Sequence, residues 1–223
     1  MSFTCRLIRD DEFNENLQSL IMKTFFQYEP MNQHLNCRIP DDIDRLWLDE
    51  VLLRAKQDQL SLAFYQSNDE ENFPIAYAIN HENHENQQED LLYNRKTDEI
   101  PLDKHQHISE LISKLHENVN LFEEFHCKNI LHIYLLGVDP IYRQNRLASQ
   151  LIEFSIHLAK EKHFDLIYAD TTSHYSFNAF FRHGFQVLKT IDYRDYQNSF
   201  GQRIFQNMQI HQGCSIVFKD LRK

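Results

Sequence analysis

A run of almost unbroken apolar residues, NILHIYLLGV at 129–138, constrains the fold more than any other stretch of the chain. Such runs are typical of strands that are buried on both faces of an α/β sheet. The run ends at Asp139-Pro140, and a short Arg-rich turn then leads into the helical pattern LASQLIEFSIHLAKEKHF. A strand, a turn and a helix start in this order gather free backbone N–H groups at the positive end of a helix dipole, which favours an anionic ligand.

Strand and helix patterns alternate along the rest of the chain, which predicts an α/β fold. Segments with strand character cover 3–9, 60–66, 73–80, 165–171, 185–193 and 214–221. Helical patterns cover 10–26, 40–57, 108–125, 147–164 and 173–183. We expect the first helix to break at YEPMN, residues 28–32, because a residue that precedes proline avoids the α region.

The length of 223 residues suits one domain, and we expect 1–223 to form it. Residues 81–104 are polar and poor in apolar side chains, so we expect a long polar loop inserted in this domain. Histidines occur there as HENHEN and continue just beyond as DKHQH, without the helical i, i+4 spacing of a catalytic zinc pair. We therefore expect exposed loop at these histidines, and no metal site.

A formal net charge of −10 argues against a nucleic-acid partner and modestly favours cationic small molecules. No apolar stretch is long enough to span a bilayer, and the N-terminus lacks the apolar core of a signal peptide. The four cysteines are widely spaced and form no CxxC pair, which is typical of reduced thiols. We expect a cytoplasmic monomer with no membrane partner.

The order of these elements, with RQNRLA after the central strand and FFRHGF after the next, resembles the GNAT acetyltransferase superfamily. Its phosphate loop, Gln/Arg-x-x-Gly-x-Gly/Ala, aligns with residues 143–148, where Arg146 replaces the glycine. FFQYEPMN, NLFEEF, LLGVDPIYRQNRLASQL and TTSHYSFNAFFRHGFQVLKTIDY are similar to the insect-type arylalkylamine N-acetyltransferases. The resemblance implies a mixed central sheet of about seven strands, flanked by helices and splayed between the fourth and fifth strands.

The resemblance also implies acetyl-CoA as co-substrate. Backbone N–H groups at the start of the helix after the loop are suited to hold a pyrophosphate, and the arginines add positive charge. In this superfamily the pantetheine arm pairs with the fourth strand where it diverges from the fifth. The implied cofactor-binding residues are Leu136, Gly137, Val138, Arg143, Gln144, Asn145, Arg146, Leu147, Ala148, Ser149 and Ser173.

Two of these positions leave alternatives open. A side chain at Arg146 either weakens the close approach of a phosphate or supplies the guanidinium as a ligand, and we expect binding to be retained. A lone glycine in a strand pattern, Gly137, indicates a bulge or a close approach to a ligand, or else packing against a neighbouring side chain. By resemblance, a backbone N–H near such a bulge stabilises the oxyanion.

Glu29 is the candidate catalytic base. It lies in FFQYEPMN, where aromatic neighbours and a proline are able to desolvate the carboxylate and raise its pKa towards neutrality. The glutamate of the family's Glu-Pro motif has this role, and the resemblance carries it to Glu29. Without the resemblance, a glutamate before proline is read as a solvated turn residue.

The cluster TTSHYS at 171–176 provides the remaining catalytic candidates. Thr172 and Ser176 align with the paired serines of the insect-type enzymes, which implies a role in protonating the leaving thiolate and positioning the cofactor sulfur. Ser173 lies between them near a helix start, where serine commonly acts as an N-cap. The tyrosine that serves many GNAT enzymes as general acid is replaced by Phe180.

Three functional hypotheses follow. The first is acetyl transfer from acetyl-CoA to a small arylalkylamine of the dopamine, tyramine, serotonin and tryptamine class, by direct attack of the amine on the thioester in a ternary complex. The second is a GNAT enzyme for another small amine, such as a polyamine. The third is a CoA-binding module without catalysis, which the substitution at Arg146 suggests.

Overall fold

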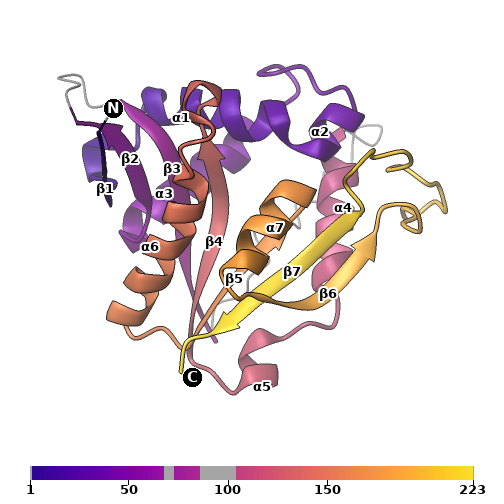
Figure 1. Cartoon of the computed structure of the whole chain (residues 1–223). Coiled ribbons are helices and arrows are strands. Elements are labelled where there is room, and N and C mark those ends of the chain that lie inside the picture. The colour runs from indigo at the N-terminus through magenta and orange to yellow at the C-terminus, as the bar shows by residue number, and fades with distance from the viewer. Residues whose placement is uncertain (1, 68–72, 86–103, 223) are drawn as a thin grey trace.

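The computed structural model describes residues 2–67, 73–85 and 104–222 of the chain. Its centre is a seven-stranded mixed sheet in the order β1-β2-β3-β4-β5-β7-β6, in which only β4 and β5 pair in parallel (Figure 1). The strands are β1 (Phe3–Leu7), β2 (Leu62–Gln66), β3 (Pro74–His84), β4 (Asn129–Val138), β5 (Leu166–Thr171), β6 (Gln186–Asp192) and β7 (Gly213–Asp220). The expected α/β fold with a seven-stranded mixed sheet is confirmed.

Helices cover both faces of this sheet. Figure 1 shows α6 and α7 in front of the sheet and α3 and α4 behind it, with α1 and α2 across the upper end of β4. The helices are α1 (Glu15–Ile21), η2 (Met22–Phe26), α2 (Pro30–His34), α3 (Arg45–Asp58), α4 (Lys104–His116), α5 (Leu121–Phe125), α6 (Leu147–Glu161) and α7 (His174–Arg182), with short 3-10 turns η1 (Asp10–Glu12) and η4 (Pro140–Tyr142). One apolar core lies under α6 and α7, and two others lie under α4 and α3 on the opposite side.

The two central strands diverge towards the upper end of the sheet. Strand pairing between β4 and β5 covers only residues 130–132 and 166–168, although β4 continues to Val138 and β5 to Thr171. The upper part of β4 still pairs with β3 on its other edge. The expected splay between the fourth and fifth strands is therefore present, and it leaves one edge of β4 without a strand partner among the described residues.

The prediction of a loop at 81–104 is wrong at both ends of that range. Residues 86–103 lie outside the described residues. Residues 81–84 belong to β3, and Lys104 opens α4. His81 is buried, with its ring stacked on Tyr134 and its Nε2 3.1 Å from the carbonyl of Val51. Polar residues stay in a buried strand where such partners satisfy them, and polarity alone does not reveal those partners.

The helical pattern at 108–125 is not one helix. It divides into α4 and α5, because Asn118 adopts a left-handed backbone conformation with φ of 60° and the Asn120 side chain caps the start of α5. The break at YEPMN is confirmed, since Glu29 has extended backbone angles and Pro30 begins α2. No helix among the residues that the structure describes is long and apolar enough to cross a membrane.

Candidate active site

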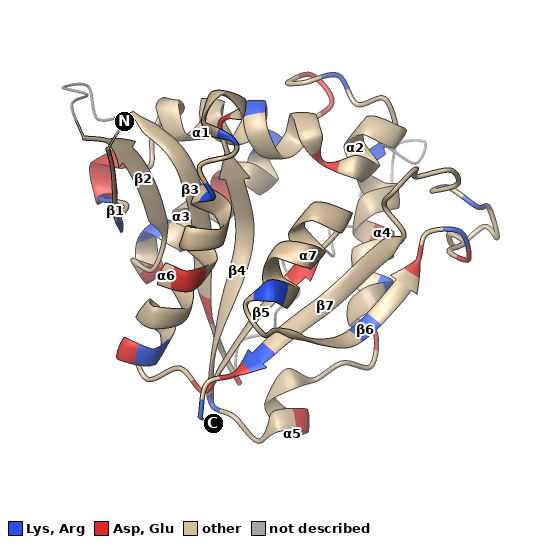
Figure 2. Cartoon of the chain, viewed as in Figure 1, with Lys and Arg blue, Asp and Glu red and all other residues tan. Residues whose placement is uncertain are grey.

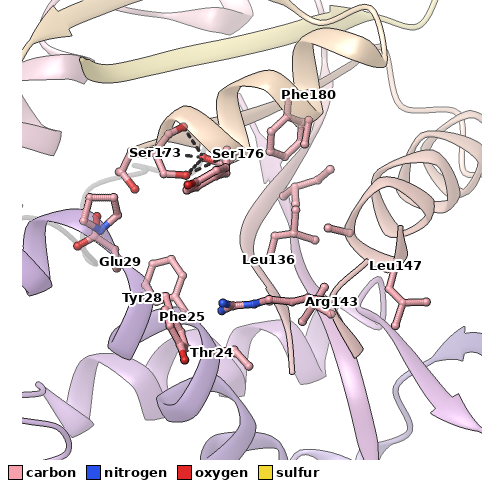
Figure 3. A pocket seen from close by; sticks show the side chains of 18 of the residues that line it. Thr24, Phe25, Tyr28, Glu29, Leu136, Arg143, Leu147, Ser173, Ser176 and Phe180 are labelled. Atoms are coloured by element: carbon pink, nitrogen blue, oxygen red, sulfur yellow. Dashed lines mark hydrogen bonds between the residues drawn. The ribbon is translucent and has the colours of Figure 1, made fainter. Parts of the chain in front are cut away.

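A cavity of about 630 Å³ opens where β4 and β5 diverge. Six parts of the chain line it: η2 with the start of α2, the upper half of β4, the loop before α6 with the first residues of that helix, the end of β5, α7, and His211 before β7. In Figure 3, Glu29 and the serines of α7 lie at one side of the cavity, and Arg143 extends into it from the other. The cavity thus joins segments that are far apart in the sequence.

The loop between β4 and α6 keeps the backbone conformation that a glycine-rich turn requires. Gln144 and Arg146 both have positive φ, 77° and 59°, a region that side chains other than glycine rarely adopt. Arg146 is the N-cap of α6, and its side chain accepts no hydrogen bond from the first N–H groups of the helix. Both arginines of the loop are exposed. The loop thus fits an anionic group, through backbone donors and positive charge.

The structure places most of the other expected cofactor-binding residues in the cavity lining and two of them outside it. Leu136, Gly137, Val138, Leu147 and Ala148 line the cavity together with Arg143, Gln144, Arg146 and Ser173. Asn145 and Ser149 are absent from its lining. The Asn145 side chain donates to the carbonyl of Tyr142, and the Ser149 hydroxyl lies 2.7 Å from Nε2 of His183. Their side chains thus bond within the loop and to the end of α7, respectively.

The glycine in β4 does not mark a bulge. The register of β3 and β4 shifts between Ile79 and Asn80, opposite Tyr134, three residues before Gly137. A Cβ on Gly137 would collide with the Tyr77 hydroxyl and lie 2.6 Å from Oγ1 of Thr24. Packing against these side chains therefore accounts for the glycine, which is the last of the three alternatives given for this position.

Glu29 is a buried carboxylate at the start of α2. Its Oε2 accepts a hydrogen bond of 2.6 Å from the N–H of Asn32 and so caps the helix, while its Oε1 accepts none from any described residue. Burial raises the pKa of Glu29 to about 7, against the backbone N–H groups of Asn32 and Met31 and the hydroxyl of Thr172, which lower it. Thr172 is close enough for this effect without forming a hydrogen bond to Oε1.

The hydroxyl groups of the 171–176 cluster make contacts in two places. Ser173 is the N-cap of α7, as expected, and its Oγ lies 2.9 Å from Oγ of Ser176 (Figure 3). Thr172 faces Glu29 instead, and its carbonyl accepts a hydrogen bond of 2.7 Å from the Tyr193 hydroxyl. Phe180 lines the cavity and is buried against Phe185, so no phenol occupies that position.

Further aromatic side chains and a second carboxylate complete the cavity lining. Phe25, Tyr134 and Asp170 line the cavity, and the ring of Tyr28 carries the guanidinium of Arg143 at 4.0 Å. The Tyr134 ring is held between aromatic neighbours: it stacks on His81 at 4.7 Å and meets His132 edge-on at 4.9 Å. Phe25 and Tyr28 belong to the FFQYEPMN segment whose aromatic residues were expected beside Glu29, whereas Tyr134 and Asp170 lie in segments that read simply as buried strands.

Figure 2 shows acidic and basic residues on several outer elements, while β4 carries neither sign. Within the cavity lining, the charged side chains fall into two groups: Arg143 and Arg146 in the loop, and Glu29 and Asp170 beyond the splay. An anionic ligand and a cationic ligand therefore find complementary charge in different parts of one cavity.

A model of the GNAT acetyltransferase family matches residues 41–185. No curated protein matches the sequence significantly. Among solved structures, arylalkylamine N-acetyltransferase 2 from Aedes aegypti is 25% identical, with 99% of this chain and 100% of that chain covered and a TM-score of 0.87. The polyamine N-acetyltransferase of Drosophila melanogaster, which forms N-acetylagmatine, is 19% identical, with 98% and 100% covered and a TM-score of 0.81.

A more distant structure is that of NAA60 from Arabidopsis thaliana in complex with acetyl-CoA, 14% identical, with 98% and 99% covered and a TM-score of 0.53. The family model spans more than half of the chain, and the splayed sheet with its loop and helix start agrees with it. The chain belongs to the GNAT acetyltransferase family and is an acyltransferase.

Proposed function

We propose that the protein transfers an acetyl group from acetyl-CoA to the primary amine of a small arylalkylamine. The observation that carries the proposal is the placement of one buried carboxylate, Glu29, in the same cavity as a phosphate-type loop. Aromatic side chains at Phe25, Tyr28 and Tyr134 line the space beside it, and flat rings pack favourably against such walls. The fold shared with the Aedes aegypti arylalkylamine N-acetyltransferase supports the same substrate class.

Acetyl-CoA, the co-substrate, supplies the acetyl group as a thioester. In the proposed complex, backbone N–H groups of 144–149, with Arg143 and Arg146, hold the pyrophosphate. The free edge of β4 at 136–138 offers backbone groups to the pantetheine amides. The cleft between the strands then holds the acetyl carbon near the amine, which removes much of the entropic cost of bringing two reactants together.

Glu29 accepts the proton that the ammonium must lose before the nitrogen attacks. A carboxylate is an efficient base when its pKa lies near the working pH, and burial raises the pKa of Glu29 to about 7. Oε1 has no donor among the described residues, so in the proposed complex it is the oxygen that accepts the proton, directly or through a water. Oε2 stays bonded to the N–H of Asn32, which fixes the orientation of the carboxylate.

Hydroxyl groups on the same side of the cavity as Glu29 complete the proposed site. Thr172 lies beside Glu29, and Ser176 is held by Ser173 at the start of α7. We assign to Thr172 and Ser176 the positioning of the thioester sulfur and the return of a proton to the leaving thiolate. Phe180 excludes a tyrosine acid at that position, so a hydroxyl of this cluster takes over the task.

The first test is acetyl-CoA consumption, followed as free thiol, against tyramine, dopamine, serotonin, tryptamine and spermidine. Wild-type protein should show saturable turnover on the arylalkylamines. Glu29→Gln should lower kcat/KM by about a hundredfold or more, because a positioned general base contributes that much. Calorimetry should show CoA binding to this variant with unchanged affinity. Glu153→Gln, at an exposed glutamate of α6, is the matched control and should leave turnover unchanged.

Other outcomes separate the alternatives. Turnover of spermidine alone would replace the arylalkylamine with a polyamine, the class named for the Drosophila melanogaster relative. CoA binding without turnover of any amine would indicate a binding module. Failure of CoA to bind would show that the side chain of Arg146 has abolished the phosphate site.

A further inference from the structure

Asp170 is a buried carboxylate that the proposed transfer reaction does not use. It lies near the end of β5, lines the cavity, and has a side chain that is only 9% exposed. Its Oδ2 lies 2.9 Å from Nε2 of His116 on α4, while its Oδ1 accepts no hydrogen bond from any described residue. A buried acceptor without a donor costs free energy, so an acceptor of this kind in a ligand cavity is matched by a donor on the ligand.

The position of Asp170 relative to Glu29 defines where that donor sits. Asp170 and Thr172 are two residues apart, about 6.5 Å of extended chain, and Thr172 faces Glu29. Both carboxylates also act on one buried thiol: after burial itself, the charges of Asp170 and then Glu29 raise the pKa of Cys214 well above its usual range. The two carboxylates therefore lie near each other, and both line the cavity. Ile133 and Tyr134 line the same cavity and provide apolar and aromatic wall.

The charge of Asp170 is already stabilised without a ligand. Burial alone would raise the pKa of Asp170, but the charge and hydrogen bond of His116 outweigh it, with a smaller contribution from His132 at 3.9 Å, and leave the pKa below its usual value. What remains without a donor is a single buried acceptor atom, Oδ1. A ring hydroxyl has one hydrogen to donate, which matches that single acceptor.

We propose that Oδ1 of Asp170 accepts a hydrogen bond from the ring hydroxyl of the substrate and so selects hydroxylated arylalkylamines over their unsubstituted analogues. This inference rests on the proposed amine acetylation. In this arrangement the amine nitrogen lies at Glu29, the ring lies along Tyr134, and the hydroxyl end reaches Asp170. The bond joins a neutral donor to an ionised acceptor, which is stronger than a bond between two neutral groups.

The test compares three substrates of the same skeleton: tyramine, phenethylamine and 4-methoxyphenethylamine. On wild-type protein, kcat/KM for tyramine should exceed that for phenethylamine at least tenfold, and the methoxy compound, which cannot donate, should be no better than phenethylamine. In Asp170→Ala the ratio of tyramine to phenethylamine should fall towards one, through loss of tyramine turnover alone. Glu153→Gln, at an exposed glutamate of α6 outside the cavity lining, is the matched control and should keep the wild-type ratio.

The readouts separate the two proposals. Acetylation of phenethylamine reports the proposed function, and the ratio of the two substrates reports Asp170. If no amine is acetylated, the proposed function itself fails. Equal turnover of tyramine and phenethylamine by wild-type protein would overturn the hydroxyl assignment, as would an unchanged ratio in Asp170→Ala. Putrescine turnover that exceeds tyramine turnover and disappears in Asp170→Ala would overturn it in favour of a distal ammonium. The wild-type comparison needs no variant, so it stands even if Asp170→Ala does not fold.

Discussion

The two sides of the splayed sheet offer different chemical groups to a ligand. On the side of α6 and α7, the proposed CoA site consists of backbone: a loop with two left-handed residues, an uncapped helix start and the free edge of β4. On the side of α4, the proposed amine site consists of buried side chains, with Glu29 and Asp170 as its two carboxylates. A site made of backbone tolerates substitution of its side chains, whereas a site made of buried charges depends on each of them.

The two sides should also differ in how their functional residues affect the free energy of unfolding. A buried carboxylate with a raised pKa is an unfavourable element of the native state at neutral pH and above. The arginines of the loop carry no comparable cost, because their charges are exposed to water. We therefore expect a large conflict between function and stability at the amine side and only a small one at the loop.

The largest effect on stability should come from Glu29→Gln. The pKa of Glu29 is raised in the folded state, so ionising it there costs free energy, and the cost appears as the pH rises from the usual glutamate range through about 7. Replacement by glutamine should raise the free energy of unfolding by up to about 3 kcal/mol at pH 8 and change it little near pH 4.5. Urea unfolding at both pH values measures this. An equal change at both values would show that Glu29 is not strained by burial.

The pH dependence of catalysis sharpens the same point. Glu29 must be ionised to accept a proton, so kcat/KM should rise with pH and level off above about 7, changing about tenfold per unit below it. Amines with different pKa values distinguish this limb from ionisation of the substrate. A limb that stays near pH 7 for all of them belongs to the enzyme, and one that follows the amine would remove Glu29 from the role of base.

The smallest effect should come from the loop. Arg146→Gly should raise the free energy of unfolding by at most about 1 kcal/mol, because glycine adopts the left-handed conformation without strain. If the guanidinium contacts phosphate, the variant should also bind CoA severalfold more weakly in calorimetry. Arg146→Asn is the control, since asparagine tolerates this conformation but lacks the charge. Tighter CoA binding by Arg146→Gly would contradict the inferred contact.

The sequence predicted the parts of the site that neighbouring residues encode, and Glu29 through its resemblance to a family motif. The loop at 143–148, the strand before it and the N-cap at Ser173 follow from local patterns, because turns and helix starts are encoded by neighbouring residues. Asp170 was missed, because its partner His116 lies 54 positions away and no local pattern joins them. The same limit explains His81, which reads as a polar loop residue until Val51 and Tyr134 are placed beside it.

The short pairing between β4 and β5 leaves the sheet incomplete. Beyond Ile130–His132 of β4 and Leu166–Tyr168 of β5, no described strand pairs with the edge of β4 that faces β5. A ligand whose amides bond to this edge would act as one further strand of the sheet. Its binding free energy would then add to the free energy of unfolding, so the melting temperature should rise with ligand concentration. In this sense a ligand bound there would supply the strand that the sheet lacks beside β4.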